Sequence, residues 1–204
     1  ISELQSRGLD RVLDLARTQP GFRYTVDGSW VIQEYLRGRS ARHDAALIRS
    51  IRRGVVEMPA VYASHFTGFA SLENLVRSLY PARQLSREHR LPFDLALSTD
   101  VPSHSWSWAS VLHAAGVRYF VAASDAYRAP FLLENRLHEA SPFRWEGPDG
   151  AAVWTWYSRH YHQGASLLGA PPRMESAEES LPRFLQAYDR SDYASSSVLL
   201  YGTQ

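Results

Sequence analysis

Seven consecutive residues near the middle of the chain combine a carboxylate, a histidine, serines and an indole. They are Asp100-Val101-Pro102-Ser103-His104-Ser105-Trp106, between an apolar strand pattern and a helical pattern. At the carboxyl end of a parallel strand, a carboxylate points into the ligand site of an α/β barrel, where it can act as nucleophile or metal ligand. The alternative is a turn aspartate whose side chain caps the following backbone N–H groups.

Further histidines follow two other expected strands. His65 comes shortly after the apolar segment 55–61, and His160 and His162 come shortly after 152–157. Imidazole nitrogens at strand ends can bind a metal or hydrogen-bond a substrate. A single histidine of this kind is more often a hydrogen-bonded loop residue. The three histidines together therefore indicate a functional site more strongly than any one of them does.

Aromatic side chains are abundant, with 6 Trp, 11 Tyr and 8 Phe. Sugar rings present apolar C–H faces that stack on aromatic rings, while their hydroxyl groups need polar partners. Trp106 and Tyr161 lie beside the candidate residues in the sequence, and Asp27 follows another short strand pattern. We therefore count Asp27, His65, His104, Trp106, His160 and Tyr161 as candidate substrate contacts around Asp100.

Helical and strand patterns alternate along the chain. Apolar spacing predicts helices over 2–17, 30–36, 41–53, 72–80, 106–115 and 181–188, and strands over 22–26, 55–61, 93–98, 117–122 and 197–201. A Gly-Pro-Asp-Gly turn at 147–150 predicts a hairpin between 143–145 and 152–157. The alternation predicts a parallel sheet with crossover helices, either a barrel or an open sheet, with ligands at the carboxyl ends of the strands.

Composition excludes several classes of protein. The 204 residues carry a net charge of +1 and no cysteine, which excludes a disulfide framework and a thiolate metal site. No run approaches the ~18 apolar residues of a membrane span, and no signal-peptide pattern opens the chain. We expect a cytoplasmic protein with no membrane partner and, given the near-neutral charge, no nucleic-acid partner.

Three stretches together resemble the N-terminal catalytic domain of glycoside hydrolase family 38, the α-mannosidases. They are 54–79, which includes Leu-Glu-Asn-Leu-Val-Arg-Ser-Leu, then 99–120, and finally 141–150, which reads Ser-Pro-Phe-Arg-Trp-Glu-Gly-Pro-Asp-Gly. The most specific element is the Asp-x-x-x-His-Ser segment that begins at Asp100, ahead of the Ala-Gly-Val-x-Tyr-Phe strand. The similarity covers most of the chain in the same order.

The resemblance implies a seven-stranded (β/α) barrel of the glycoside hydrolase and deacetylase type, incomplete in this chain. It implies a zinc-dependent hydrolase that cleaves α-mannosides with retention, in which the aspartate matching Asp100 is both nucleophile and zinc ligand. Residues 1–204 would be the central part of one catalytic domain, truncated at both ends. The other zinc ligands would lie outside the chain and the acid/base carboxylate just beyond Gln204, so we expect the isolated fragment to be inactive.

Two alternatives stay open. A metal-dependent polysaccharide deacetylase on a related barrel would use Asp100 as a base or ligand and would release acetate rather than free sugar. A catalytically inactive carbohydrate-binding domain would bind sugar without turnover. Linkage specificity and oligomeric state are not determined by these patterns.

Overall fold

The computed structural model describes residues 2–124, 137–193 and 195–202. Its helices are α1 (Ser2–Thr18), α2 (Ser29–Gly38), α3 (Ala41–Arg52), the 3₁₀ turn η1 (Thr67–Phe69), α4 (Leu72–Arg77), α5 (Tyr80–His89), α6 (Ser107–Ala114), α8 (Leu137–Ala140), α9 (Gln163–Leu168) and α10 (Met174–Gln186). Its strands are β1 (Tyr24–Thr25), β2 (Val56–Glu57), β3 (Leu95–Thr99), β4 (Tyr119–Ala123), β5 (Phe143–Glu146) and β6 (Ala152–Ser158).

The strands form two sheets. Strands β1 and β2 pair in parallel, and the larger sheet has the order β3-β4-β6-β5. In that sheet β3, β4 and β6 are parallel, with Thr99 opposite Ala123 and Ala123 opposite Ser158, whereas β5 pairs antiparallel with β6. The carboxyl ends of three parallel strands therefore meet at one edge, as the alternation of patterns predicts.

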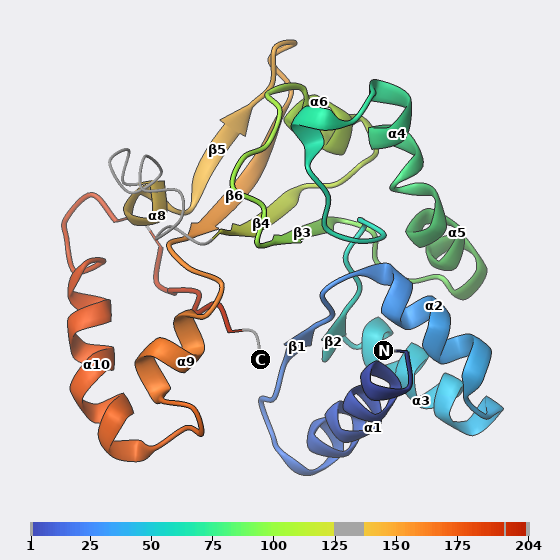
Figure 1. Ribbon diagram of the computed structural model, residues 1–204, viewed down its shortest axis with the longest axis horizontal. Helices are drawn as coiled ribbons and strands as arrows, with labels where there is room; N and C mark the ends of the chain where they lie inside the picture. Colours follow the sequence, from blue (N-terminus) through green and yellow to red (C-terminus); the bar gives the residue numbers. More distant parts are fainter. Residues whose placement is uncertain (1, 125–136, 194, 203–204) are drawn as a thin grey trace.

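The segment after β2 joins the two sheets. The Ala60 N–H donates to the Leu95 carbonyl at 2.7 Å, and the Thr99 N–H donates to the Ser64 hydroxyl oxygen at 2.9 Å. Residues 60–64 thus run beside β3, and the end of β1 is brought to the same edge. In Figure 1 the larger sheet lies at the top, α1–α3 lie at the lower right, and α9 and α10 form a separate lobe at the lower left.

The core is apolar and lies between the sheets and the first six α-helices. Helix α6 contributes a buried stripe that includes Trp108, Ala109 and Leu112, and it packs against β5 and β6. Of the described residues, Trp108, Tyr35 and Phe120 have the largest fully buried side chains. This core fixes β3, and with it the loop that carries Asp100.

The expected seven-stranded barrel is wrong. The described strands form sheets of two and four strands that do not close on each other. The antiparallel strand β5 occupies the outer edge of β6, where a barrel would need another parallel strand. The segment 197–201, expected as a further strand, is not a strand either: the backbone of Tyr201 bonds instead to α9, through the Gly164 N–H and the Gln163 side chain.

The local predictions are confirmed for most elements, with two corrections. Helices α5, α8 and α9 were not expected: the expected helix over 72–80 ends at Arg77 and α5 begins at Tyr80, while α8 and α9 have only 4 and 6 residues. Helix α10 begins at Met174, so Pro182 lies inside it rather than in its first turn. None of the described helices combines the length and apolar character that a membrane crossing requires.

Candidate functional site

Asp100 occupies the carboxyl end of β3, the position at which sheet proteins of this class bind ligands. Its N–H donates to the Ala123 carbonyl at 2.8 Å, which fixes the turn to β4. Its backbone has a φ of 58°, in the left-handed region that aspartate and asparagine tolerate better than most residues. The side chain is exposed, so the turn holds a solvent-accessible carboxylate in a strained backbone conformation.

A chain of side-chain hydrogen bonds lies directly beside this turn. The Thr99 hydroxyl group is 2.6 Å from the Asp27 carboxylate and 2.6 Å from the Tyr201 hydroxyl group. An ionised carboxylate only accepts, so Thr99 donates to Asp27 and Tyr201 donates to Thr99. Residues separated by 72 and 102 positions in the sequence are thereby joined at one point.

This hydrogen-bonded chain shifts the acidity of its two titratable members. Packing around Asp27 raises the pKa of its carboxyl group, and the hydrogen bond from Thr99 opposes that effect. Burial raises the pKa of Tyr201, the Thr99 bond opposes it, and the Asp27 charge raises it further. Tyr201 is therefore a hydroxyl donor at neutral pH, and Asp27 is the acceptor at the end of the chain.

Gly28 explains how β1 comes so close to this edge. A Cβ atom at Gly28 would lie 2.6 Å from the backbone oxygen of Tyr62. The neighbouring N–H groups of Ser29 and Trp30 donate to the carbonyls of Val61 and Tyr62, both at 3.1 Å. Only glycine allows this approach, which places Asp27 next to the loop that follows β2.

Replacing Thr99 by valine should lower the free energy of unfolding by about 1–3 kcal/mol, because Tyr201 loses its acceptor and Asp27 its donor. Replacement by serine keeps the hydroxyl group and should recover most of this loss. Urea unfolding of both variants measures the difference. Equal stability of the valine and serine variants would show that the hydrogen bonds contribute nothing beyond the packing of the side chain.

Two of the expected site histidines pack against aromatic side chains of the core, and His65 is half-buried at the edge of a cavity. His104 packs against Phe120 and Trp145, with ring centroids 5.0 and 6.3 Å away, and His65 packs edge-on against Trp108 at 5.6 Å. Both ring nitrogens of His104 are buried and lack a hydrogen-bond partner among the described residues. Burial lowers the pKa of His104 to about 4, and the nearby His65 adds to that effect, so His104 is neutral at pH 7.

The remaining expected contacts are dispersed around the edge. The Trp106 indole N–H donates to the Glu146 carbonyl at 2.7 Å, and most of its ring stays exposed. His160 and Tyr161 stack on each other with ring centroids 5.0 Å apart, and the His160 Nδ1 accepts from the His162 N–H. Tyr161 also packs against the small apolar cluster that contains Tyr201, which places it near the hydrogen-bonded chain.

The residues that sequence reasoning missed are Thr99, Tyr201 and Ser64. Thr99 precedes Asp100 directly and ends a strand pattern, so its position was a usable signal. Ser64 lies directly before His65 in the loop after an expected strand, whereas Tyr201 carried no local signal, because its role depends on pairing between distant segments.

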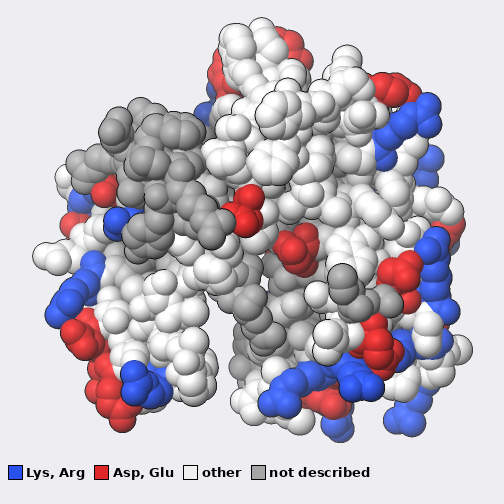
Figure 2. All heavy atoms as spheres, in the orientation of Figure 1, with Lys and Arg blue, Asp and Glu red and all other residues white. Residues whose placement is uncertain are grey.

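The described residues do not fit a zinc site by themselves. No group of three or more His, Asp or Glu side chains in the described part of the chain is arranged to hold a metal ion. Figure 2 shows acidic atoms near the centre of the face where β1 and β3 end, with the basic side chains at the periphery. The centre of this face can offer a carboxylate to a cation but not a complete set of ligands.

A comparison with models of known protein families identifies the family of this chain. Its sequence matches the model described as "Glycosyl hydrolases family 38 N-terminal domain" over residues 3–204. The chain belongs to glycoside hydrolase family 38. No curated protein sequence matches it.

Solved structures agree with the fold of this family 38 domain. A family 38 glycosyl hydrolase and an alpha-mannosidase, both from Enterococcus faecalis, superpose with TM-scores of 0.65 and 0.72 at 18% and 19% identity. Each match covers 98% of this chain but only 21% and 22% of the solved chains, so this chain spans about a fifth of their length. A 4-alpha-glucanotransferase from Thermococcus litoralis matches 77% of the chain and 25% of its own, with a TM-score of 0.58 and 14% identity.

Proposed function

We propose that this chain forms part of a longer glycoside hydrolase acting on α-mannosides and that Asp100 is its nucleophile. The observation that carries the proposal is the exposed Asp100 carboxylate at the carboxyl end of the parallel strand β3, in a chain of family 38. A retaining glycosidase needs such a carboxylate, accessible to the sugar and held by a rigid strand.

The proposed reaction has two displacement steps at the anomeric carbon of the sugar. A carboxylate oxygen of Asp100 attacks the anomeric carbon while the bond from that carbon to the leaving oxygen breaks. A carboxylic acid elsewhere in the longer protein gives its proton to the leaving oxygen. Water then attacks the same carbon and passes a proton to that second carboxylate, and Asp100 leaves with its electron pair. Two displacements at one carbon retain its configuration.

Asp27 is suited to orient the sugar rather than to react with it. The Thr99 hydroxyl group occupies one of its carboxylate oxygens and leaves the other able to accept a sugar hydroxyl proton. His65, Trp106, His160 and Tyr161 stay candidate substrate contacts. The core packing of His104 fits support of the Asp100 loop better than contact with the sugar.

We propose a zinc site only as one whose ligands come partly from residues outside this chain. Asp100 would be one ligand, and the others would come from elsewhere in the longer protein, because the described residues offer no complete set. A bound zinc ion would supply Lewis-acid stabilisation of sugar hydroxyl groups.

Product analysis tests the proposal directly. The longer protein is incubated with an aryl α-mannoside, and proton NMR follows the first anomer of free mannose. Release of the α-anomer supports a nucleophile at Asp100, and first release of the β-anomer contradicts it. Acetate released from an acetylated polysaccharide, with no free sugar, would favour the deacetylase, and sugar binding without turnover would favour an inactive binding domain.

A further inference from the structure

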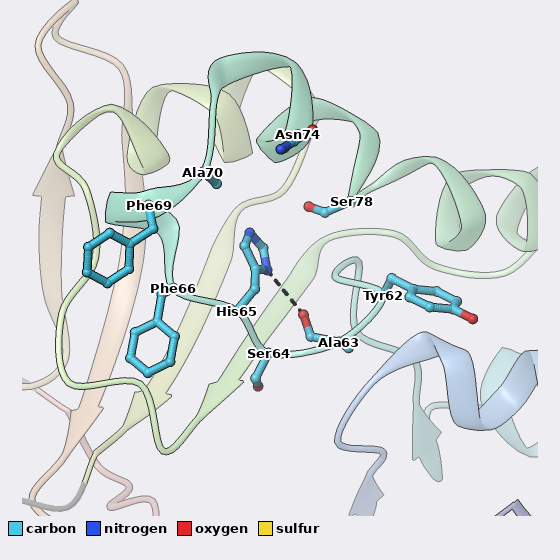
Figure 3. A pocket seen from close by; sticks show the side chains of 9 residues that line it. All are labelled: Tyr62, Ala63, Ser64, His65, Phe66, Phe69, Ala70, Asn74 and Ser78. Carbon is cyan, nitrogen blue, oxygen red and sulfur yellow. Dashed lines mark hydrogen bonds between the residues drawn. The ribbon is translucent and has the colours of Figure 1, made fainter.

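A separate cavity of about 410 Å³ lies between the loop after β2 and helix α4. Its volume falls within the range of small-molecule sites, ~300–1,000 Å³. Figure 3 shows the Phe66 and Phe69 rings at one end, Tyr62 at the other, and Asn74 and Ser78 projecting from the helical wall. The lining residues are Tyr62, Ala63, Ser64, His65, Phe66, Phe69, Ala70, Asn74 and Ser78.

Two phenylalanine rings are exposed at this cavity. Phe69 is 92% exposed and Phe66 50%, and their ring centroids lie 6.1 Å apart. Exposed aromatic rings gathered at a cavity mark a binding surface more often than single scattered apolar residues do. The pair forms an apolar platform of two rings tilted by 58° to each other, and the C–H face of a pyranose ring can pack on the face of either ring.

The cavity offers hydroxyl, amide and imidazole groups to a ligand. Asn74 is exposed and lines the cavity, so its side-chain amide can donate to and accept from a ligand. The Ser78 hydroxyl group donates to the Leu75 carbonyl at 2.7 Å and can still accept. Among the described residues, no arginine, aspartate or glutamate lines the cavity, which favours a neutral hydroxyl-bearing ligand over a phosphate, a carboxylate or a cation.

The cavity is also tied to the loop that carries Asp100. Ser64, one of its lining residues, accepts the hydrogen bond from the Thr99 N–H. Thr67, between the two phenylalanines, accepts from the Ser105 N–H at 2.7 Å. The loop that forms the aromatic platform is therefore bonded to Asp100's loop on both sides of Asp100.

From these contacts we infer that this cavity is a second sugar subsite, which binds a neutral pyranose unit of the substrate other than the unit that Asp100 attacks. The inference rests on the proposed function in taking the substrate to be a glycan. It adds that the substrate is an oligosaccharide and that Phe66 and Phe69 contribute to its selection.

The test compares a long and a short substrate in the longer protein. Phe69→Ala should lower kcat/KM for α-linked mannotriose about 2- to 10-fold, the usual worth of one aromatic contact, and leave kcat/KM for p-nitrophenyl α-mannoside unchanged. Leu72→Ala is the matched control, because Leu72 is 64% exposed and lies outside the cavity. The subsite would be overturned if Phe69→Ala lowered kcat/KM equally for the two substrates. It would also be overturned if Phe69→Ala and Leu72→Ala gave the same kcat/KM for mannotriose.

A binding measurement separates this inference from the proposed function. Mannotriose is titrated into wild-type protein and into Phe69→Ala, with saturation-transfer NMR as the readout. Binding weakened by Phe69→Ala supports the subsite even if no mannoside is hydrolysed. Absence of mannotriose binding to the wild-type protein overturns the inference. It is also overturned if Phe69→Ala binds mannotriose as the wild type does but unfolds at a lower temperature. That result would mean that another segment of the longer protein covers the rings.

Discussion

Asparagine in place of Asp100 should lower kcat for α-mannoside hydrolysis by at least ~10⁴-fold, the scale of loss when an enzyme's nucleophile is removed. A neutral amide cannot form the glycosyl ester, so the first displacement fails. The loss should appear in kcat, because Asp27 and the aromatic side chains that we propose to bind the sugar are unchanged. Steady-state kinetics of the longer protein on an aryl α-mannoside measures it.

The choice of asparagine matters because of the backbone at this position. Asp100 has a φ of 58°, and asparagine accepts the left-handed region as readily as aspartate does. Alanine would add about 1–2 kcal/mol of strain and would mix a folding defect with a catalytic one. We therefore expect Asp100→Asn to unfold at the same temperature as the wild type.

Asp14→Asn provides the matched control for this substitution. Asp14 lies on the exposed side of α1, where its partner Arg17 is equally exposed and their ion pair contributes little. This variant should keep full activity. Activity of Asp100→Asn within tenfold of the wild type would refute Asp100 as nucleophile and would leave the turn aspartate as a structural cap.

The position of Asp100 could be predicted from local pattern, because strand β3 is a short apolar run that ends in a polar turn. A side chain at the carboxyl end of a parallel strand lies at the ligand-binding edge whatever the rest of the sheet does. Asp27 was found by the same argument. Their proximity through Thr99 agrees with it.

The closure of the sheet could not be predicted in this way, because it depends on pairing between distant strands. The hairpin turn at 147–150 correctly predicted two strands, but their antiparallel pairing also ends the parallel sheet at β6. The segment 197–201 has the composition of a strand, yet the backbone of Tyr201 bonds to α9. Local propensity does not choose among such partners.

His104 shows a different limit of sequence reasoning. A histidine four residues after a candidate nucleophile has the composition of a site residue, but its ring faces Phe120 and Trp145. The orientation of a loop side chain follows from the space available in the core, which the sequence does not show. Its burial has a measurable consequence for stability.

The stability of the protein should fall on acidification because of His104. Its pKa is about 4 in the folded protein and ~6.5 when unfolded, so between these values the unfolded chain binds more protons. Stability due to this residue is constant above ~6.5 and decreases as the pH falls towards 4. At pH 4.5 we expect a loss of about 2–3 kcal/mol relative to pH 7.5.

His104→Phe isolates this effect from the titration of other groups. Phenylalanine keeps an aromatic ring against Phe120 and Trp145 but cannot be protonated, so its own loss between pH 7.5 and 4.5 should be smaller by the same 2–3 kcal/mol. Urea unfolding of both proteins at the two pH values provides the comparison. An imidazole that could reach water would keep its ordinary pKa. If both proteins lose the same unfolding free energy between pH 7.5 and 4.5, His104 is accessible to water. Its role as a substrate contact would then be favoured over a role in the core.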